Sequence, residues 1–313
     1  MLLTAYALAL FTSSSQTGLA SITTPEVAQV VSWLPPDTET LVVAAEPGYT
    51  GATKEGSKLA SDVRSLACMA FSNQEGDPLP LSYRFIVDGS KNYRFPKDLG
   101  IGTWEGCAIV ALQDGQRATI EQRLKKSADH TAQLAGHFTY VFQTKETEYQ
   151  ASWKKYICFD GPYMICAVDK NSFLQVLDRK VHPHSDRALP DSLEEWKYPE
   201  AGTAFFAIRK FTAPYAQLNG ITNMGDAKMD GLAVWLSKDR KALNVISIAD
   251  GSQAFQGDKN FWQGFLKQEG WKHSVDVTAV DSRTTRIVLD AQGDHSERPL
   301  FILMAMLGHP IFV

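Results

Sequence analysis

Residues 156–168 read YICFDGPYMICAV, in which Gly161-Pro162 separates two runs of apolar and aromatic residues. Such runs favour β-strands, and a Gly-Pro pair between them favours a turn. The stretch therefore predicts a β-hairpin. Its two cysteines, Cys158 and Cys166, lie symmetrically about Pro162 and could form a disulfide across the hairpin. The alternative is that both are small buried apolar residues.

The strand pattern continues on both sides of this hairpin. Residues 137–143 form a third strand-like run, and Asn171 or Ser172 can cap a helix after the hairpin. Earlier strand-like runs cover 40–45, 83–87 and 107–112, and earlier helix-like segments cover 27–33, 58–71 and 120–126. We interpret residues 181–199, which contain three prolines and mixed charge, as a connector.

After the connector the chain repeats a similar order of elements. Strand-like runs cover 203–208, 232–236, 243–248, 275–280 and 284–289, and helices are expected at 260–268 and from Ser296 onward. Strand pairs that alternate with single helices are typical of an α+β fold, in which helices cover an antiparallel sheet. We therefore predict an α+β protein with two similar halves, residues 21–180 and 200–313, packed together.

The composition is that of an ordinary globular protein. The chain has 313 residues, of which 44% are hydrophobic and 21% are charged. Its net charge of -4 gives no attraction to a polyanion, so we expect no nucleic-acid partner. No run after the N-terminus approaches the roughly 18 apolar residues of a membrane-spanning helix, so we expect no transmembrane helix in the mature chain.

Residues 1–20 have features of a secretory signal peptide. Residues 1–11 are mostly apolar, the following residues are mostly polar, and a signal peptidase could cut after Ala20. The first residues include no Lys or Arg, so the amino terminus supplies their only positive charge. The even count of four cysteines is compatible with an oxidising compartment. We expect an exported protein, periplasmic or secreted; the alternatives are a buried N-terminal helix or strand, or an incorrectly chosen start codon.

The candidate metal ligands lie in the connector, within the sequence HPHSD. In an extended backbone alternate side chains share a face, so His182, His184 and Asp186 could bind one divalent metal ion. Such a metal site would indicate a metal-dependent hydrolase. The alternative is a solvated connector in which these histidines bind nothing. The adjacent carboxylates of Glu194 and Glu195 are expected on an exposed turn.

No other motif indicates catalysis. The G-x-S-x-G, HExxH, Walker and EF-hand patterns are absent. The glycine-rich residues 100–106 precede a predicted strand, whereas a dinucleotide site needs a helix there. Two of the seven tryptophans, Trp104 and Trp196, lie in loop-like surroundings. They could line a carbohydrate- or peptide-binding surface, and packing in the core is the alternative.

Three phrases carry a family resemblance: residues 33–40 (WLPPDTET), residues 188–196 (ALPDSLEEW) and residues 307–310 (LGHP). Together they resemble a group of uncharacterised bacterial exported proteins that open with a W-x-P-x-D-T-E-T phrase. The resemblance implies a location in the bacterial envelope. It implies no catalytic residues, because that group has no assigned activity.

These observations favour a non-catalytic exported protein that binds a small ligand or a partner protein and has no cofactor. Two alternatives stay open. One is a metal-dependent hydrolase that uses His182, His184 and Asp186, and it requires a divalent metal ion. The other is a structural envelope component or an inhibitor.

Overall fold

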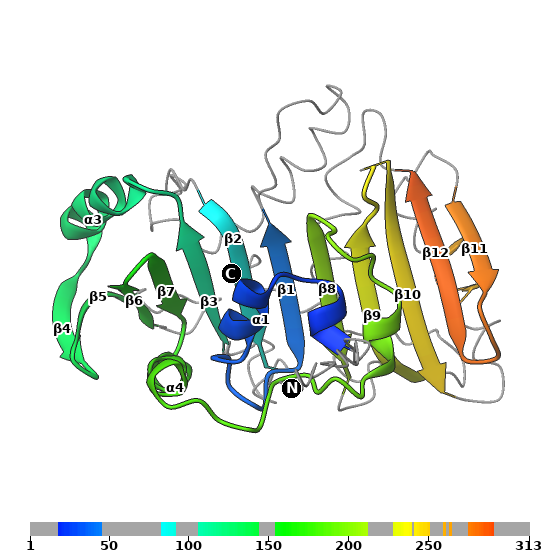
Figure 1. The fold of residues 1–313 in the computed structure, drawn as a ribbon, viewed down its shortest axis with the longest axis horizontal. Coiled ribbons are helices and arrows are strands. Elements are labelled where there is room, and N and C mark those ends of the chain that lie inside the picture. The colour runs from blue at the N-terminus through cyan, green and yellow to red at the C-terminus, as the bar shows by residue number, and fades with distance from the viewer. Residues whose placement is uncertain are drawn as a thin grey trace, which may run out of the picture.

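The computed structural model describes residues 18–45, 83–91, 106–143, 154–211, 228–239, 241–250, 259–260, 263–264 and 275–290. Its strands are β1 Thr40–Ala45, β2 Tyr83–Ser90, β3 Gly106–Leu112, β4 His130–Leu134, β5 His137–Gln143, β6 Lys154–Asp160, β7 Tyr163–Ala167, β8 Phe205–Lys210, β9 Lys228–Leu236, β10 Ala242–Asp250, β11 Val275–Ala279 and β12 Thr284–Asp290. They form one antiparallel sheet in the order β11-β12-β10-β9-β8-β1-β2-β3-β7-β6-β5-β4 (Figure 1).

The prediction of an α+β fold is wrong, because this twelve-stranded sheet outweighs the helices among the described residues. Those helices are α1 Pro25–Val31, α3 Gln116–Ser127 and α4 Lys170–Val181, with two short 3-10 segments, η1 Gly18–Ser21 and η2 Glu194–Lys197. The predicted halves also do not pack as two bodies, since β1 pairs with β2 on one side and with β8 on the other. The apolar run of β1 is buried between strands of both predicted halves. The two halves therefore share one sheet.

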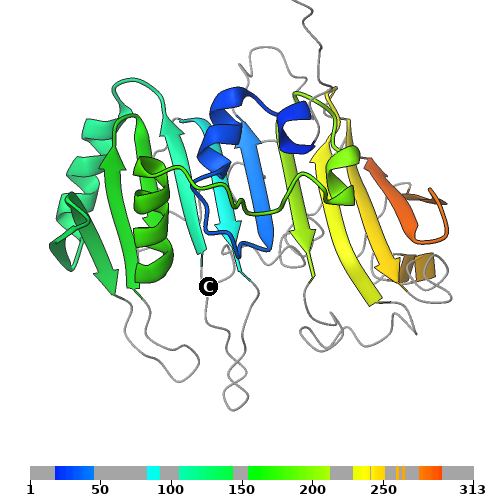
Figure 2. The same ribbon diagram turned by 60° about the horizontal axis from the view of Figure 1, so that its bottom comes forward.

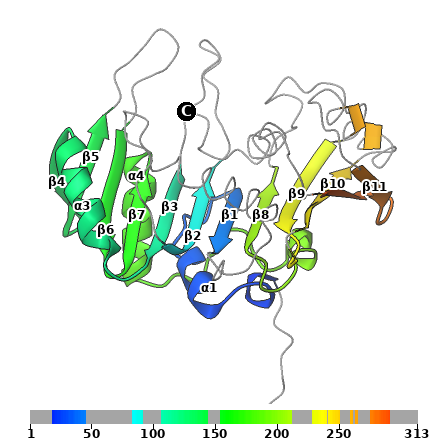
Figure 3. The same cartoon turned by 90° about the horizontal axis from the view of Figure 1, so that it is seen from above.

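Each face of the sheet has its own hydrophobic core. On the first face, called here the helical face, the strands pack with α1, α4, η1 and η2. The valines of α1 at 27, 30 and 31 point into this core, as their three- and four-residue spacing requires. On the second face, α3 packs through Ile120 and Leu124. Figure 3 shows a curved sheet with α1 on its convex side.

The hairpin predicted at residues 156–168 is confirmed. It consists of β6 and β7, joined by a turn in which Gly161 has a φ of 61°, a value that favours glycine. The helix α4 follows, but neither predicted residue is its N-cap. Instead, Asp169 Oδ1 accepts a hydrogen bond from the backbone N–H of Ser172 at 2.7 Å. Asp169 Oδ2 accepts one from Gly106 at 3.2 Å, which connects α4 to β3.

Most strand predictions within the described residues are confirmed. The bounds of β1 and β5 match the predictions, and β9–β10 and β11–β12 are the predicted second-half pairs. The structure adds β4, which pairs with β5. Residues 1–17 of the leader, the helices expected at 58–71 and from Ser296, and most of that at 260–268 lie outside the described residues. None of the described helices is long and apolar enough to span a membrane.

The connector is part of the folded body. Figure 2 shows it leaving α4, crossing the strands on the helical face and reaching η2. Its apolar residues Ala188, Leu189, Leu193 and Trp196 are all buried in the same core as α1 and η1. The connector therefore stabilises the helical face and is not a detached linker.

Candidate functional site

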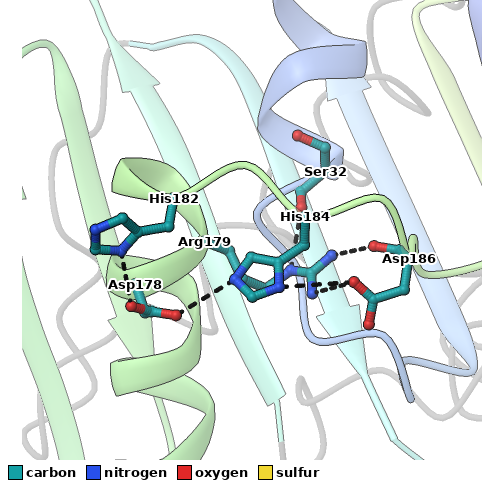
Figure 4. A network of polar contacts seen from close by, with 6 residues as sticks. All are labelled: Ser32, Asp178, Arg179, His182, His184 and Asp186. Atoms are coloured by element: carbon teal, nitrogen blue, oxygen red, sulfur yellow. Dashed lines mark hydrogen bonds and ion pairs between the residues drawn. The ribbon is translucent and has the colours of Figure 1, made fainter.

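The predicted metal ligands lie where α4 runs into the connector (Figure 4). His182 follows the last residue of α4, and its Nδ1 atom lies 3.0 Å from Oδ1 of Asp178, one helical turn earlier. The Nε2 atom of His184 lies 3.5 Å from the second oxygen of the same carboxylate. The two imidazoles therefore share Asp178, a residue that the HPHSD pattern did not indicate.

Asp186 binds the guanidinium group of Arg179, and its Oδ1 atom also lies 3.9 Å from Nδ1 of His184. Nη1 of Arg179 donates to the Asp186 carboxylate at 3.0 Å, and Nη2 donates to the backbone carbonyl of Asp186. Nε of Arg179 donates to the carbonyl of Ser32, just after α1, at 3.2 Å. The side chain of Arg179 is only 5% exposed. Arg179 therefore connects α4, the connector and the end of α1.

These contacts also lower the pKa of two carboxyl groups. A hydrogen bond with His182 holds the pKa of Asp178 below its ordinary value, and His184 acts in the same direction. The hydrogen bond from Arg179 lowers the pKa of Asp186. Both carboxylates are thus bound to side chains of this chain. Among the described residues, no three metal-binding side chains are grouped so that they could hold a metal ion.

The cysteines predicted to form a disulfide are not in the register that a bond would need. Cys158 lies opposite Ile165 and Cys166 lies opposite Ile157, so the two thiols point to opposite faces of the sheet. Both are free and buried. Burial raises the pKa of Cys158 to about 12 and that of Cys166 to about 11. The structure thus places both as small buried residues.

Trp196 lies in the core and not on a surface. It is 3% exposed, and its Nε1 atom donates to the carbonyl of Pro190 at 3.0 Å. Its ring packs edge-on against Phe206, with centroids 6.3 Å apart. The ring of Trp196 is therefore not exposed, as a carbohydrate- or peptide-binding surface would require. The other candidate, Trp104, lies outside the described residues.

Glu195 is buried, contrary to the exposed turn expected from the sequence. It is 4% exposed and lies directly over β9, where a Cβ atom added at Gly231 would come within 1.7 Å of Glu195 Oε1. Desolvation raises the pKa of Glu195 above its ordinary value. Gly231 therefore provides the space that the carboxyl group occupies, and this contact positions η2 on β9.

A row of polar side chains that the sequence analysis missed crosses the second face. Strand register places side by side Thr285, Ser247, Leu232, Arg209, Thr40 and Ser90. The five polar members are at most 3% exposed, so a ligand cannot reach them in this structure. The sequence did contain a sign of this row. Side chains alternate between the two faces of a strand, so Arg209 of β8 had to lie on the same face as the apolar Phe205 and Ala207.

An accessible candidate site is the strand β4, which forms one edge of the sheet. It pairs with β5 on one side and with no described strand on the other. Its sequence, HTAQL, contains no Pro, Lys, Asp or Glu, the residues by which edge strands commonly prevent pairing with other chains. The opposite edge strand, β11, does carry a charge on an exposed side chain, Asp276. The two edges therefore differ in their readiness to pair.

The surroundings of β4 have two distinct ends. The last turns of α3 carry the exposed cations Arg123, Lys125 and Lys126 shortly before β4 begins at His130. Near its other end, opposite Gln133, lies Phe138 of β5. Phe138 is 49% exposed, which is unusual for a large apolar residue among those that the structure describes. This edge of the sheet thus combines an edge strand, nearby positive charges and an exposed apolar side chain.

Comparisons with known proteins found weak structural likenesses. No protein-family model matches the chain, and no curated protein matches it in sequence. Crystal form I of TP0453 is 10% identical and aligns over 88% of this chain and 96% of that chain, with a TM-score of 0.49. Crystal form III of TP0453 is 10% identical and aligns over 88% and 97%, with a TM-score of 0.44. A likeness at this level supports no conclusion about fold or function.

Proposed function

We propose that this chain is an exported, non-catalytic protein that binds a partner protein by strand addition at β4. The observation that carries the proposal is the edge of β4, which has no strand partner among the described residues on its outer side. The outward N–H and C=O groups of an edge strand can bind an extended segment of another chain.

The surroundings of β4 define the chemistry of the partner segment. Lys125 and Lys126 lie shortly before the strand and attract acidic side chains, whereas Phe138 lies near its end and attracts an apolar side chain. The five residues of β4 extend over about 17 Å. The partner is therefore an extended segment of similar length, acidic at one end and apolar at the other.

The cluster predicted to bind metal supports a role without catalysis. Arg179 binds both the carboxylate and the backbone carbonyl of Asp186, and a metal ion at that carboxylate would have to compete with a buried cation. The metal-dependent hydrolase is the second candidate, favoured by the approach of His182 and His184 to Asp178 and of His184 to Asp186. Metal analysis of the purified protein beside a His184→Ala variant separates the two.

Site-specific photo-crosslinking in the cells that make the protein tests the proposal. A photoreactive amino acid at Gln133 of β4 should give a discrete adduct with another protein, and the attached peptide should contain Asp or Glu. The same amino acid at Thr278 of β11 is the matched control, because both residues are exposed on edge strands. Combining the Gln133 probe with Lys125→Glu and Lys126→Glu should reduce the adduct, as should combining it with Phe138→Ser.

Several results would overturn the proposal. No adduct at Gln133, an equal yield from Thr278, or an adduct insensitive to the charge reversal would each do so. An adduct with a second copy of this chain would show that β4 mediates self-association and does not bind another protein. A protein with only a structural role would give no adduct at all. Fractionation of the same cells tests export, since a protein confined to the cytoplasm contradicts it.

A further inference from the structure

The 3-10 segment η1, Gly18–Ser21, is part of the folded body. Leu19 is fully buried, and it belongs to the same core as Leu189, Leu193 and Trp196. A signal peptidase cut after Ala20 would remove Leu19 from this core. Loss of a buried leucine leaves a cavity and exposes its neighbours, which destabilises a protein strongly.

A polar contact fixes the same segment. The backbone N–H of Leu19 donates to Asp191 Oδ1 at 3.1 Å. Arg187 holds this carboxylate with two hydrogen bonds, of 2.6 Å and 3.2 Å. Cleavage after Ala20 would remove the donor and leave Asp191 with one partner fewer.

The backbone at Gly18 is adapted to this contact as well. Gly18 has a φ of +67°, and a Cβ atom there would lie 1.9 Å from Asp191 Oδ1. Both the backbone conformation and the close approach of the carboxylate require glycine. Gly18, Leu19 and Ala20 therefore all belong to η1, which packs on the connector.

We infer that the mature protein retains Gly18, Leu19 and Ala20, so that a signal peptidase acting on this chain cuts on the N-terminal side of Gly18. The inference rests on the proposed export only for the existence of a cut. The retention of the three residues rests on their burial and hydrogen bonds. It moves the boundary expected from the sequence, where Ala20 was the last residue of the leader.

Two measurements test the inference. The intact mass of the protein purified from the periplasm should correspond to a first residue at or before Gly18, and a first residue of Ser21 overturns it. Separately, chains beginning at Gly18 and at Ser21 are expressed without a leader and compared by thermal unfolding. The chain beginning at Ser21 should unfold at a lower temperature, by about 5 to 15 °C.

Variants keep the second measurement decisive if the shorter chain does not fold. Leu19→Ala in the chain beginning at Gly18 should lower Tm over a similar range, whereas Gln29→Ala, at an exposed position of α1, should leave it nearly unchanged. Equal Tm values for Leu19→Ala and the parent chain overturn the inference. An uncut protein in the cytoplasm would contradict export alone, since the Tm comparison does not depend on export.

Discussion

Glu195 illustrates at the residue scale how burial sets the behaviour of a charged group. Its carboxyl group is removed from water against Gly231, and desolvation raises its pKa. An acid whose pKa is raised on folding contributes stability at low pH, below its pKa in the unfolded chain. That contribution is lost as pH rises through the pKa of the folded state, because ionisation then costs more in the folded protein.

The variant Glu195→Gln, which cannot ionise, should therefore gain stability relative to the parent protein as pH rises. We expect the unfolding free energy of Glu195→Gln, relative to that of the parent protein, to rise between about pH 4 and about pH 8. Urea unfolding at several pH values measures it. The control is Glu194→Gln, which removes the same charge from a less buried neighbour on η2. A stability difference that does not vary with pH would contradict a raised pKa for Glu195.

At the scale of elements, the local sequence predicted most strands well, but it did not predict the edge strand β4. The bounds of β1 and β5 follow from dense β-branched and aromatic residues, a signal contained within each run. β4 was missed because its sequence, HTAQL, does not alternate clearly between apolar and polar residues. An edge strand is specified mainly by its neighbour β5, and that information is not local.

The candidate sites show the same limit. Asp178, which binds both histidines of the predicted metal cluster, lies four residues before His182 on α4 and outside the HPHSD pattern. A signal for Trp196 was present, since Ala188, Leu189 and Leu193 are also apolar in a segment interpreted as a connector. Their burial depends on α1 and η1, which pack on the connector from distant parts of the sequence.

Arg179 provides a test of how the connector is held. Replacing it with methionine leaves the carbonyl groups of Ser32 and Asp186 without their donors. We expect Arg179→Met to lower the unfolding free energy by about 1 to 3 kcal/mol. Asp186→Asn keeps both carbonyls paired and removes an exposed charge, so it should lower the unfolding free energy less than Arg179→Met does. Urea denaturation compares them, and equal losses would show that the ion pair alone stabilises the connector.

At the scale of the whole molecule, the pairing of β1 with β8 determines how the two predicted halves behave. The register is continuous across this pair, so that Val234 of β9, Ala207 of β8, Val42 of β1 and Asp88 of β2 lie in one row. A single sheet shares backbone hydrogen bonds and a hydrophobic core across the boundary. Loss of packing on one side should therefore lower the stability of the other side as well.

The variant Val234→Ala tests this coupling, because Val234 is fully buried in the second half of the chain. Its loss of packing should cost about 2 kcal/mol. Native-state hydrogen exchange should show protection falling by a similar amount in β9 and β10 and in β2 and β3, across the boundary. Thr278→Ala, at an exposed position of β11, is the control and should change neither group. If exchange accelerates only in β8 to β12, the halves unfold independently, and the continuous sheet does not make them one cooperative unit.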